Sequence, residues 1–200
     1  MHPQLQAVEI TNYILGHLHD YDVIFVNYSN PDVLGHTGNL DAAIKGLKVI
    51  DLCLGSLYDK LINHDEGKLI ITADHGNCEK MVDENGNIKT YHTTCKVPFI
   101  LCERKIHLAD DNVSIANIAP TILQYLGLSA PKAMQGTSLI KQNTILNKVF
   151  DAIKRPTMIL EVNTLNEKAL TDIISINPKQ NETTDNKPTY VDENDFSLLE

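Results

Sequence analysis

Residues Lys68-Leu69-Ile70-Ile71-Thr72-Ala73-Asp74-His75-Gly76-Asn77 join a short apolar run directly to a cluster of polar residues. A continuous apolar run of this length is typical of a strand buried on both faces of a parallel or mixed sheet. The Asp-His pair follows at once, where loops at the carboxyl ends of such strands gather functional side chains. The stretch therefore predicts a buried strand that ends in a functional site.

Two further apolar runs, at residues 23–26 and 96–101, are also predicted to be buried strands. Pro98 lies inside the later run and places it at a strand start or at a sheet edge. Between the first two strands, residues 40–61 have a helical pattern. Strand, helix and strand in this order predict an α/β domain with a crossover connection.

The helical patterns rest on apolar residues at steps of three and four. Asn39 occupies the N-cap position of the helix expected at 40–61, and residues 5–18 and 113–127 give two further amphipathic candidates. Gly127 is a plausible stop for the last of these helices, and residues 83–86 predict a hairpin turn. The expected apolar faces are formed by Leu40, Ile44, Leu47, Ile50, Leu54, Leu57 and Leu61, and by Ile115, Ile118, Ile122 and Leu126.

The composition excludes several classes of protein. The chain has 200 residues, 42% of them hydrophobic and 22% charged, and its net charge is −9. Nucleic acid and anionic membrane are unexpected partners, because both require a concentrated positive face. No apolar run reaches the roughly 18 residues of a membrane span, and Met1–Gln4 does not open a secretory signal. Four cysteines without an export signal fit a reducing cytosol, so we expect a cytoplasmic protein.

Three regions differ in composition. Residues 1–140 carry the alternating strands and helices and are expected to form one folded domain. Residues 141–175 have apolar positions for a helix and for a short strand near 158–160. This region is left as an unassigned extension of helix or strand. Residues 176–200 hold two lysines against six acidic residues, with Asn and Thr throughout. This composition predicts an acidic, disordered tail.

Polar residues that bind metals lie beside each predicted strand. Asp32 and His36 follow the first strand, Asp74 and His75 follow the second, and His92 precedes the third. Imidazole and carboxylate groups bind divalent transition metals, and three protein ligands leave an open position for catalysis. An Asp-His pair on a tight loop can also serve two adjacent ions. One such pattern arises by chance, but three beside successive strands indicate a metal site.

A structural zinc site is the alternative. Two His-x-x-Cys pairs, at 75–78 and 92–95, have the residue types of a tetrahedral Cys2His2 site. That interpretation makes the protein a zinc module without catalysis, and it leaves Asp32, His36 and Asp74 without a role. The cysteines are more simply explained as small, half-buried hydrophobic residues.

At these residues the sequence resembles the cofactor-independent (2,3-bisphosphoglycerate-independent) phosphoglycerate mutase family, a branch of the alkaline phosphatase superfamily. Residue order, spacing and loop context match over roughly residues 5–140, the C-terminal part of the family's phosphatase-like domain. One departure is Cys95-Lys96, where the family usually has Asn-Pro. The matching segments are residues 27–38, 71–77, 92–94, 97–99, 119–123 and 134–139.

The resemblance implies a glycolytic isomerase that interconverts 3-phosphoglycerate and 2-phosphoglycerate through a phosphoserine intermediate. It implies an alkaline-phosphatase-like sheet with flanking helices, here without the N-terminal strands and the inserted transferase domain. It also implies two divalent ions, Mn²⁺ first, with Mg²⁺, Zn²⁺ or Co²⁺ as alternatives. Carried over by position, Asp32, His36 and His92 match the ligands of one ion, and Asp74 and His75 match two ligands of the other.

The nucleophilic serine, a further Asp ligand and the arginines that hold substrate lie elsewhere in such enzymes. We therefore expect no catalytic nucleophile in this chain, no mutase activity of the chain alone, and one competent metal site. Phosphoglycerate is the expected substrate, and a separate chain carrying the missing segment is an expected partner. Two alternatives remain: a non-catalytic remnant or metal-binding module, and part of another metal-dependent phosphatase or phosphomutase.

Overall fold

The structure of the protein is a computed structural model that describes residues 6–65, 67–103, 106–110, 113–141 and 157–161. Four strands are present among these residues: β1 (Val23–Asn27), β2 (Ile70–Thr72), β3 (Phe99–Leu101) and β4 (Thr157–Glu161). The α-helices are α1 (Ala7–His17), α2 (Asn30–Gly35), α3 (Leu40–Tyr58) and α4 (Ile118–Tyr125). Shorter helical turns are Leu18–Asp20, Cys78–Lys80 and Ile115–Asn117, and a π-helical segment, Asp59–His64, extends α3.

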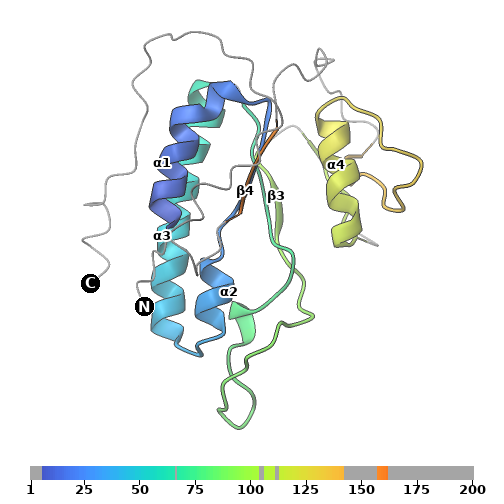
Figure 1. Cartoon of the computed structure of the whole chain (residues 1–200). Coiled ribbons are helices and arrows are strands. Elements are labelled where there is room, and N and C mark those ends of the chain that lie inside the picture. Colours follow the sequence, from blue (N-terminus) through green and yellow to red (C-terminus); the bar gives the residue numbers. More distant parts are fainter. Residues whose placement is uncertain (1–5, 66, 104–105, 111–112, 142–156, 162–200) are drawn as a thin grey trace.

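The α/β class is confirmed, and the strands pair in two groups. β1 and β4 are parallel, whereas β2 and β3 are antiparallel with Ile71 opposite Ile100. β3 begins directly after Pro98, as the proline predicted. β4 covers the 158–160 stretch for which a short strand was considered. Figure 1 shows α1 and α3 on one side of the strands and α4 on the other.

The main core lies between α1, α3 and β1. Ile14 of α1 and Cys53 of α3 are at most 2% exposed, and Ile24 and Val26 of β1 pack against the same cluster. At the end of β1, Tyr28 is hydrogen-bonded to the buried Thr11 of α1, with 2.7 Å between the two oxygens. The core therefore fixes the position from which the loop after β1 departs.

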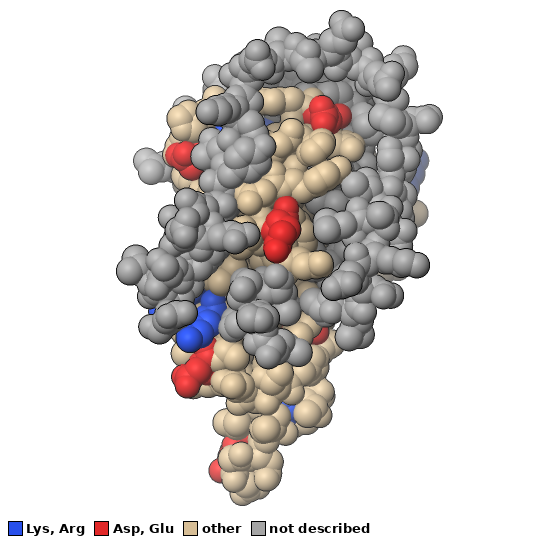
Figure 2. All heavy atoms as spheres, turned by 60° about the vertical axis from the view of Figure 1, so that its left-hand side comes forward, with Lys and Arg blue, Asp and Glu red and all other residues tan. Residues whose placement is uncertain are grey.

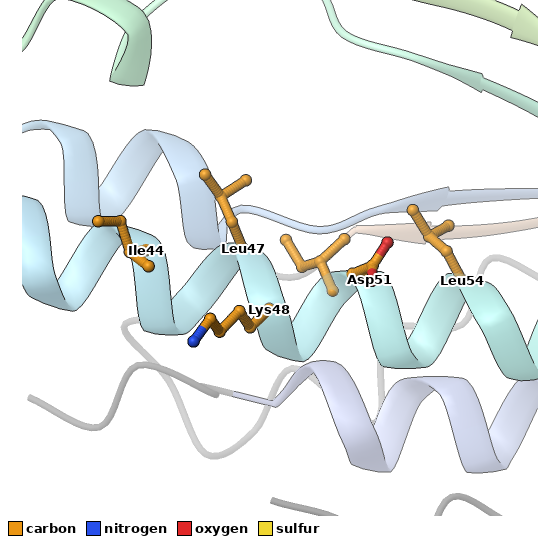
Figure 3. A pocket seen from close by; sticks show the side chains of 6 residues that line it. Ile44, Leu47, Lys48, Asp51 and Leu54 are labelled. Carbon is orange, nitrogen blue, oxygen red and sulfur yellow. The ribbon is translucent and has the colours of Figure 1, made fainter. Parts of the chain in front are cut away.

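Only two residues of the apolar face expected for α3, Ile50 and Leu57, are buried. Ile44 and Leu47 are each 44% exposed, and the buried side of the helix lies about a quarter turn away. On that side Ala43 packs with Leu34 of α2, and Val49, Cys53 and Leu57 pack in one cluster with α1. Ile44, Leu47 and Leu54 instead line an open groove (Figure 3). The buried residues of α3 are Ala43, Gly46, Val49, Ile50, Cys53 and Leu57.

The strands are also less buried than expected. Phe25 of β1 is 44% exposed and Ile100 of β3 is 49% exposed, so these two strands each have one open face. In α4 the buried residues are Pro120, Thr121 and Tyr125 rather than the predicted isoleucine stripe. Thr121, which lies outside that stripe, accepts a hydrogen bond from the Leu139 N–H at 2.8 Å.

Local signals were predicted more accurately. Asn39 caps α3 by accepting a hydrogen bond from Ala42 N–H at 3.0 Å. Gly127 follows α4 with a φ of 75°, as expected for a helix stop. The predicted turn at 83–86 lies between the bridged residues Val82 and Ile88.

Within the described part of the chain, no helix combines the length and apolar character needed to cross a membrane. The expected tail at 176–200 lies outside the described residues. So does most of the region 141–175.

Candidate metal centre

Helix α2 carries the first two residues of the site. Asp32 lies in its first turn and His36 directly follows its last residue, so the two side chains are one turn apart on the same side. His36 Nε2 lies 3.1 Å from Asp32 Oδ1. Leu34, which is 1% exposed, anchors α2 by packing with Ala43 and Met81.

The loop after β2 carries Asp74 and His75, and a short bridge brings His92 beside it. Gly76 pairs with Thr93, whose N–H donates to the Gly76 carbonyl at 2.9 Å. As a result the rings of His75 and His92 stack, with centroids 3.5 Å apart and planes at 12°. A glycine is needed here, because a Cβ at position 76 would overlap the side chains of Thr93 and Glu79.

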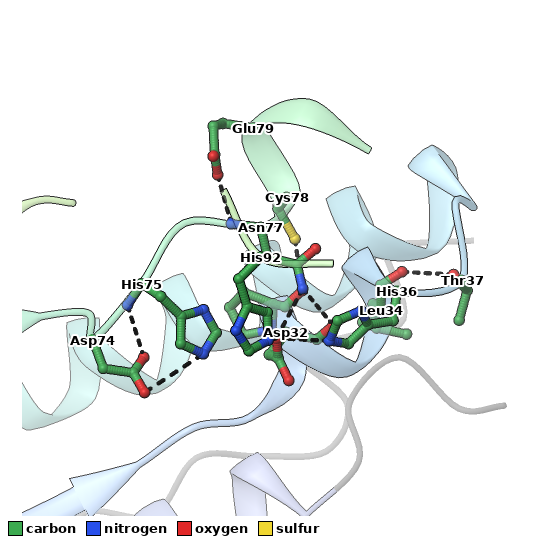
Figure 4. Close-up of polar contacts among 11 residues, drawn as sticks. Asp32, Leu34, His36, Thr37, Asp74, His75, Asn77, Cys78, Glu79 and His92 are labelled. Carbon is green, nitrogen blue, oxygen red and sulfur yellow. Dashed lines mark hydrogen bonds and ion pairs between the residues drawn. The ribbon is translucent and has the colours of Figure 1, made fainter. Parts of the chain in front are cut away.

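Helix α2 and the segment that carries His92 meet at Asp32. Its Oδ1 lies 3.1 Å from the Nε2 atoms of both His36 and His92. Figure 4 shows the side chains in a row from Asp74 through His75, His92 and Asp32 to His36. Histidines from two segments far apart in sequence therefore lie at one carboxylate.

The geometry fits a divalent ion. Ligand atoms about 2.0–2.1 Å from a tetrahedral metal lie roughly 3.3 Å from one another, close to the distances around Asp32 Oδ1. One ligand atom each of Asp32, His75 and His92 lies within 4.8 Å of the others. His75 Nδ1 is buried and has no hydrogen-bond partner among the described residues. Since buried polar atoms are nearly always paired, this nitrogen is available as a ligand.

The predicted residues come together, but in a different grouping from the one the resemblance implies. His75, assigned to the second ion, lies with Asp32 and His92 of the first. Asp74 is the outermost residue: its side chain is 84% exposed, and it contacts only His75 in the cluster. The residues expected for the two ions are therefore neighbours, and His75 lies between Asp74 and His92 (Figure 4).

The alternative Cys2His2 site does not assemble. Cys78 Sγ donates a hydrogen bond to the Pro31 carbonyl at 2.7 Å, and Cys95 is exposed. Burial, helped by the nearby Glu79 and Asp32 carboxylates, raises the pKa of the Cys78 thiol. Among the described residues the metal-ligand group contains neither cysteine.

Two residues that support the site were not predicted from the sequence. Asn77 is buried and donates through Nδ2 to Asp32 Oδ1 at 2.8 Å. Glu79 accepts hydrogen bonds from Thr93 Oγ1 and from Asn77 N–H, the latter at 2.8 Å. Slight desolvation raises the pKa of Glu79, but hydrogen bonds with Thr93, with its own backbone, with Cys95 and with Asn77 outweigh it and lower the pKa below its usual value. The available signal was their closeness to Asp-His-Gly: Asn77 follows Gly76 directly, and Glu79 comes two residues later.

Comparison with known proteins identifies the family of the chain. Residues 1–130 match the family model of the Metalloenzyme superfamily. Among relatives named 2,3-bisphosphoglycerate-independent phosphoglycerate mutase, the protein of Clostridium novyi is 46% identical over 145 residues. The protein of Microcystis aeruginosa is 47% identical over 150 residues. Each alignment covers 70% of this chain and 28% of the relative.

The protein of Mesoplasma florum, with the same name, is 44% identical over 140 residues, which are 69% of this chain and 26% of that protein. The chain thus spans a little over a quarter of the length of these relatives. The family match covers well over half of the chain and includes every predicted ligand. The chain therefore belongs to the Metalloenzyme superfamily.

Proposed function

We propose that this chain forms the metal-holding part of a phosphoglycerate mutase, which interconverts 3-phosphoglycerate and 2-phosphoglycerate in cytoplasmic glycolysis. The observation that carries the proposal is the meeting of His36 and His92 at Asp32 Oδ1. The names and the sequence identity of the relatives supply the reaction.

In this proposal Asp32, His36 and His92 hold one divalent ion, and Asp74 and His75 contribute to a second. Mn²⁺ is the proposed metal, with Mg²⁺, Zn²⁺ or Co²⁺ as alternatives. The second group has two ligands in this chain, fewer than the three protein ligands typical of a catalytic site. One competent ion site is therefore proposed for the chain alone.

Bound ions would neutralise the negative charge that develops on a transferred phosphoryl group. The residues of this chain would position those ions, since Asn77 and Cys78 of the loop after β2 hydrogen-bond to Asp32 and Pro31 of α2. The nucleophilic serine, the remaining metal ligand and the groups that hold substrate are proposed to come from a segment outside these 200 residues. That segment is the proposed partner of this chain.

Metal binding by the 200-residue chain is the first test. We expect one Mn²⁺ per chain by isothermal titration calorimetry, and a loss of affinity of about 100-fold or more in His92→Ala. The matched control is His107→Ala, because His107 lies outside the cluster. Equal binding by the two variants would contradict the ligand assignment.

Mutase activity is the second test. Residues 1–140 are grafted in place of the matching segment of the Clostridium novyi relative, and formation of 2-phosphoglycerate from 3-phosphoglycerate is measured with Mn²⁺. We expect turnover in the graft, none in His36→Ala of the graft, and none in the 200-residue chain alone. A folded, metal-loaded graft without turnover would favour a non-catalytic metal-binding module instead.

A further inference from the structure

Asn77 is a buried polar residue that contacts the candidate metal ligands. Asn77 is 6% exposed and lies in the loop after β2, 45 residues from Asp32 in sequence. Its Nδ2 donates to Asp32 Oδ1 at 2.8 Å and lies 3.3 Å from the Asp32 carbonyl oxygen. A single amide group thus contacts both the carboxylate and the backbone of one ligand (Figure 4).

The orientation of this amide follows from its neighbours. Both Asp32 atoms that face it are acceptors only, so the NH₂ end of Asn77 must point toward them. The backbone of Asn77 is fixed as well, because its N–H donates to Glu79 Oε2 at 2.8 Å. Neither the side chain nor the backbone of Asn77 is free to turn away from Asp32.

Gly35 provides the room for this contact. A Cβ at Gly35 would lie 2.8 Å from Asn77 Cγ, and closer still to its Oδ1. That distance is shorter than carbon atoms tolerate without movement. Glycine at 35 therefore permits the approach of the Asn77 amide to α2.

Cys78 adds a second link at the same place. Its Sγ donates to the Pro31 carbonyl, so consecutive residues of one loop bind consecutive residues at the start of α2. This connects the loop that carries Asp74 and His75 to the helix that carries Asp32 and His36. The relative placement of the two proposed ion sites depends on the connection.

We propose that Asn77 is a positioning residue that orients the Asp32 carboxylate for metal binding. Asp32 Oδ1 has three polar neighbours: Asn77 Nδ2 and the Nε2 atoms of His36 and His92. A histidine nitrogen that ligates a cation cannot also donate a hydrogen bond to Asp32. Of these three neighbours, Asn77 alone keeps its hydrogen bond when the histidines act as ligands.

The residue type suits this role. An amide donates hydrogen bonds without carrying charge, so it holds the carboxylate and leaves its negative charge available to a cation. A lysine or arginine here would compete with the cation, and an aspartate would repel Asp32. Outer-shell partners of this kind typically contribute about 10- to 100-fold to metal affinity.

The inference rests on the metal assignment of the proposed function, and the test separates the two. Mn²⁺ affinity of the 200-residue chain is measured by calorimetry for wild type, Asn77→Ala and Asn87→Ala. Asn87 is the matched control, because its Nδ2 donates to the Asp83 carboxylate at 2.9 Å on the exposed hairpin. We expect a roughly 10- to 100-fold weaker affinity in Asn77→Ala and no change in Asn87→Ala.

The visible absorption spectrum of bound Co²⁺ depends on the geometry of its ligands, so a loss of stability alone would not change it. At saturating Co²⁺, Asn77→Ala should shift the visible absorption bands, whereas Asn87→Ala should keep the wild-type spectrum. Asn77→Ser, too short to reach Asp32, should behave like Asn77→Ala, and it replaces that variant if Asn77→Ala does not fold in EDTA.

Wild-type affinity and an unchanged cobalt spectrum in a folded Asn77 variant would overturn this inference and leave the proposed function standing. A folded wild-type chain that binds neither Mn²⁺ nor Co²⁺ would overturn both.

Discussion

At the scale of single residues, the thiols show how the environment separates side chains of one type. Cys95 is exposed, Cys78 is half-buried with a raised pKa, and Cys53 is 0% exposed with a pKa also raised by burial. The thiolate is the reactive form, so a raised pKa slows reaction at neutral pH.

We therefore predict the order Cys95, Cys78, Cys53 for labelling by iodoacetamide at pH 7.5. Peptide mass spectrometry measures the order, and Cys53 should react only when urea unfolds the chain. Because the pKa of Cys78 is raised, its labelling rate should keep rising above pH 8.5. Labelling of Cys78 as fast as that of Cys95 would contradict the hydrogen bond to Pro31.

The pKa of Glu79 is shifted downward, in contrast to the raised pKa values of the thiols, and this shift gives a prediction about stability and pH. Its carboxylate links Asn77 to Thr93, and its pKa is lowered in the folded chain. A lowered folded-state pKa means that the stabilisation is present at neutral pH and disappears as the pH falls through that pKa.

Glu79→Gln should accordingly lower the free energy of unfolding at pH 7 by about 0.5–1 kcal/mol, a small value because the side chain is exposed. At a pH below the lowered pKa of Glu79, the two proteins should have the same urea midpoint. Glu84→Gln, on the exposed turn, is the control and should match wild type at both pH values. A difference for Glu79→Gln that persists at low pH would show that the carboxylate charge is not its cause.

At the scale of secondary-structure elements, an N-cap residue fixes the start of α3, shortly after the candidate ligand His36. Asn39 follows Gly38, which has a φ of 68°, and its Oδ1 accepts from Ala42 N–H. Asn39→Ala should cost about 1 kcal/mol of stability, whereas Asn39→Asp should keep most of the cap. Thermal unfolding followed by circular dichroism measures both, and equal losses in the two variants would argue against capping.

Helix α4 depends on one buried hydroxyl. Thr121 is 0% exposed; its Oγ1 donates to the Asn117 carbonyl at 2.6 Å and accepts from Leu139 N–H at 2.8 Å. Thr121→Val keeps the shape but leaves the Leu139 N–H unpaired, and it should cost about 1–3 kcal/mol. Thr121→Ser should cost less, because the hydroxyl remains. Urea unfolding measures the stability of both variants. If Thr121→Val is as stable as Thr121→Ser, the hydrogen bond between the Leu139 N–H and Thr121 does not stabilise the protein.

The elements also show which features the sequence could predict. Caps, turns and strand starts at Asn39, Gly127 and Pro98 were predicted correctly, because each depends on a few neighbouring residues. The buried face of α3 was not, since the helix has apolar residues on two sides. Only the positions of α1 and α2 decide which side is covered, and small residues such as Gly46 carry little hydrophobic signal.

The site follows the same division. Asp32, His36, Asp74, His75 and His92 were predicted as ligands. In the structure His36 and His92 lie at Asp32 and His75 stacks on His92, whereas Asp74 lies at the exposed end of the cluster. The position of His75 against His92 depends on the bridge between Gly76 and Thr93, which pairs residues distant in sequence. The contact of Asn77 with Asp32 spans 45 residues and could not be predicted from local sequence.

At the scale of the whole molecule, the described surface has an apolar stripe. On the side where α1 and α3 lie, most of the described surface is uncharged and the acidic side chains stand apart (Figure 2). The groove on α3 includes Ile44, Leu47 and Leu54, with Lys48 and Asp51 as its charged members (Figure 3). Contiguous exposed apolar surface of this kind favours association.

We therefore predict that the 200-residue chain associates in a concentration-dependent manner, as measured by sedimentation velocity. Leu47→Glu places a charge in the groove and should weaken this association by about tenfold or more, because burying an unpaired carboxylate is costly. Ile115→Glu is the control: Ile115 is 58% exposed but lies in the turn before α4, outside the groove. If the two variants sediment alike, the groove is not the contact surface. Reduced association in Leu47→Glu alone would assign it to α3.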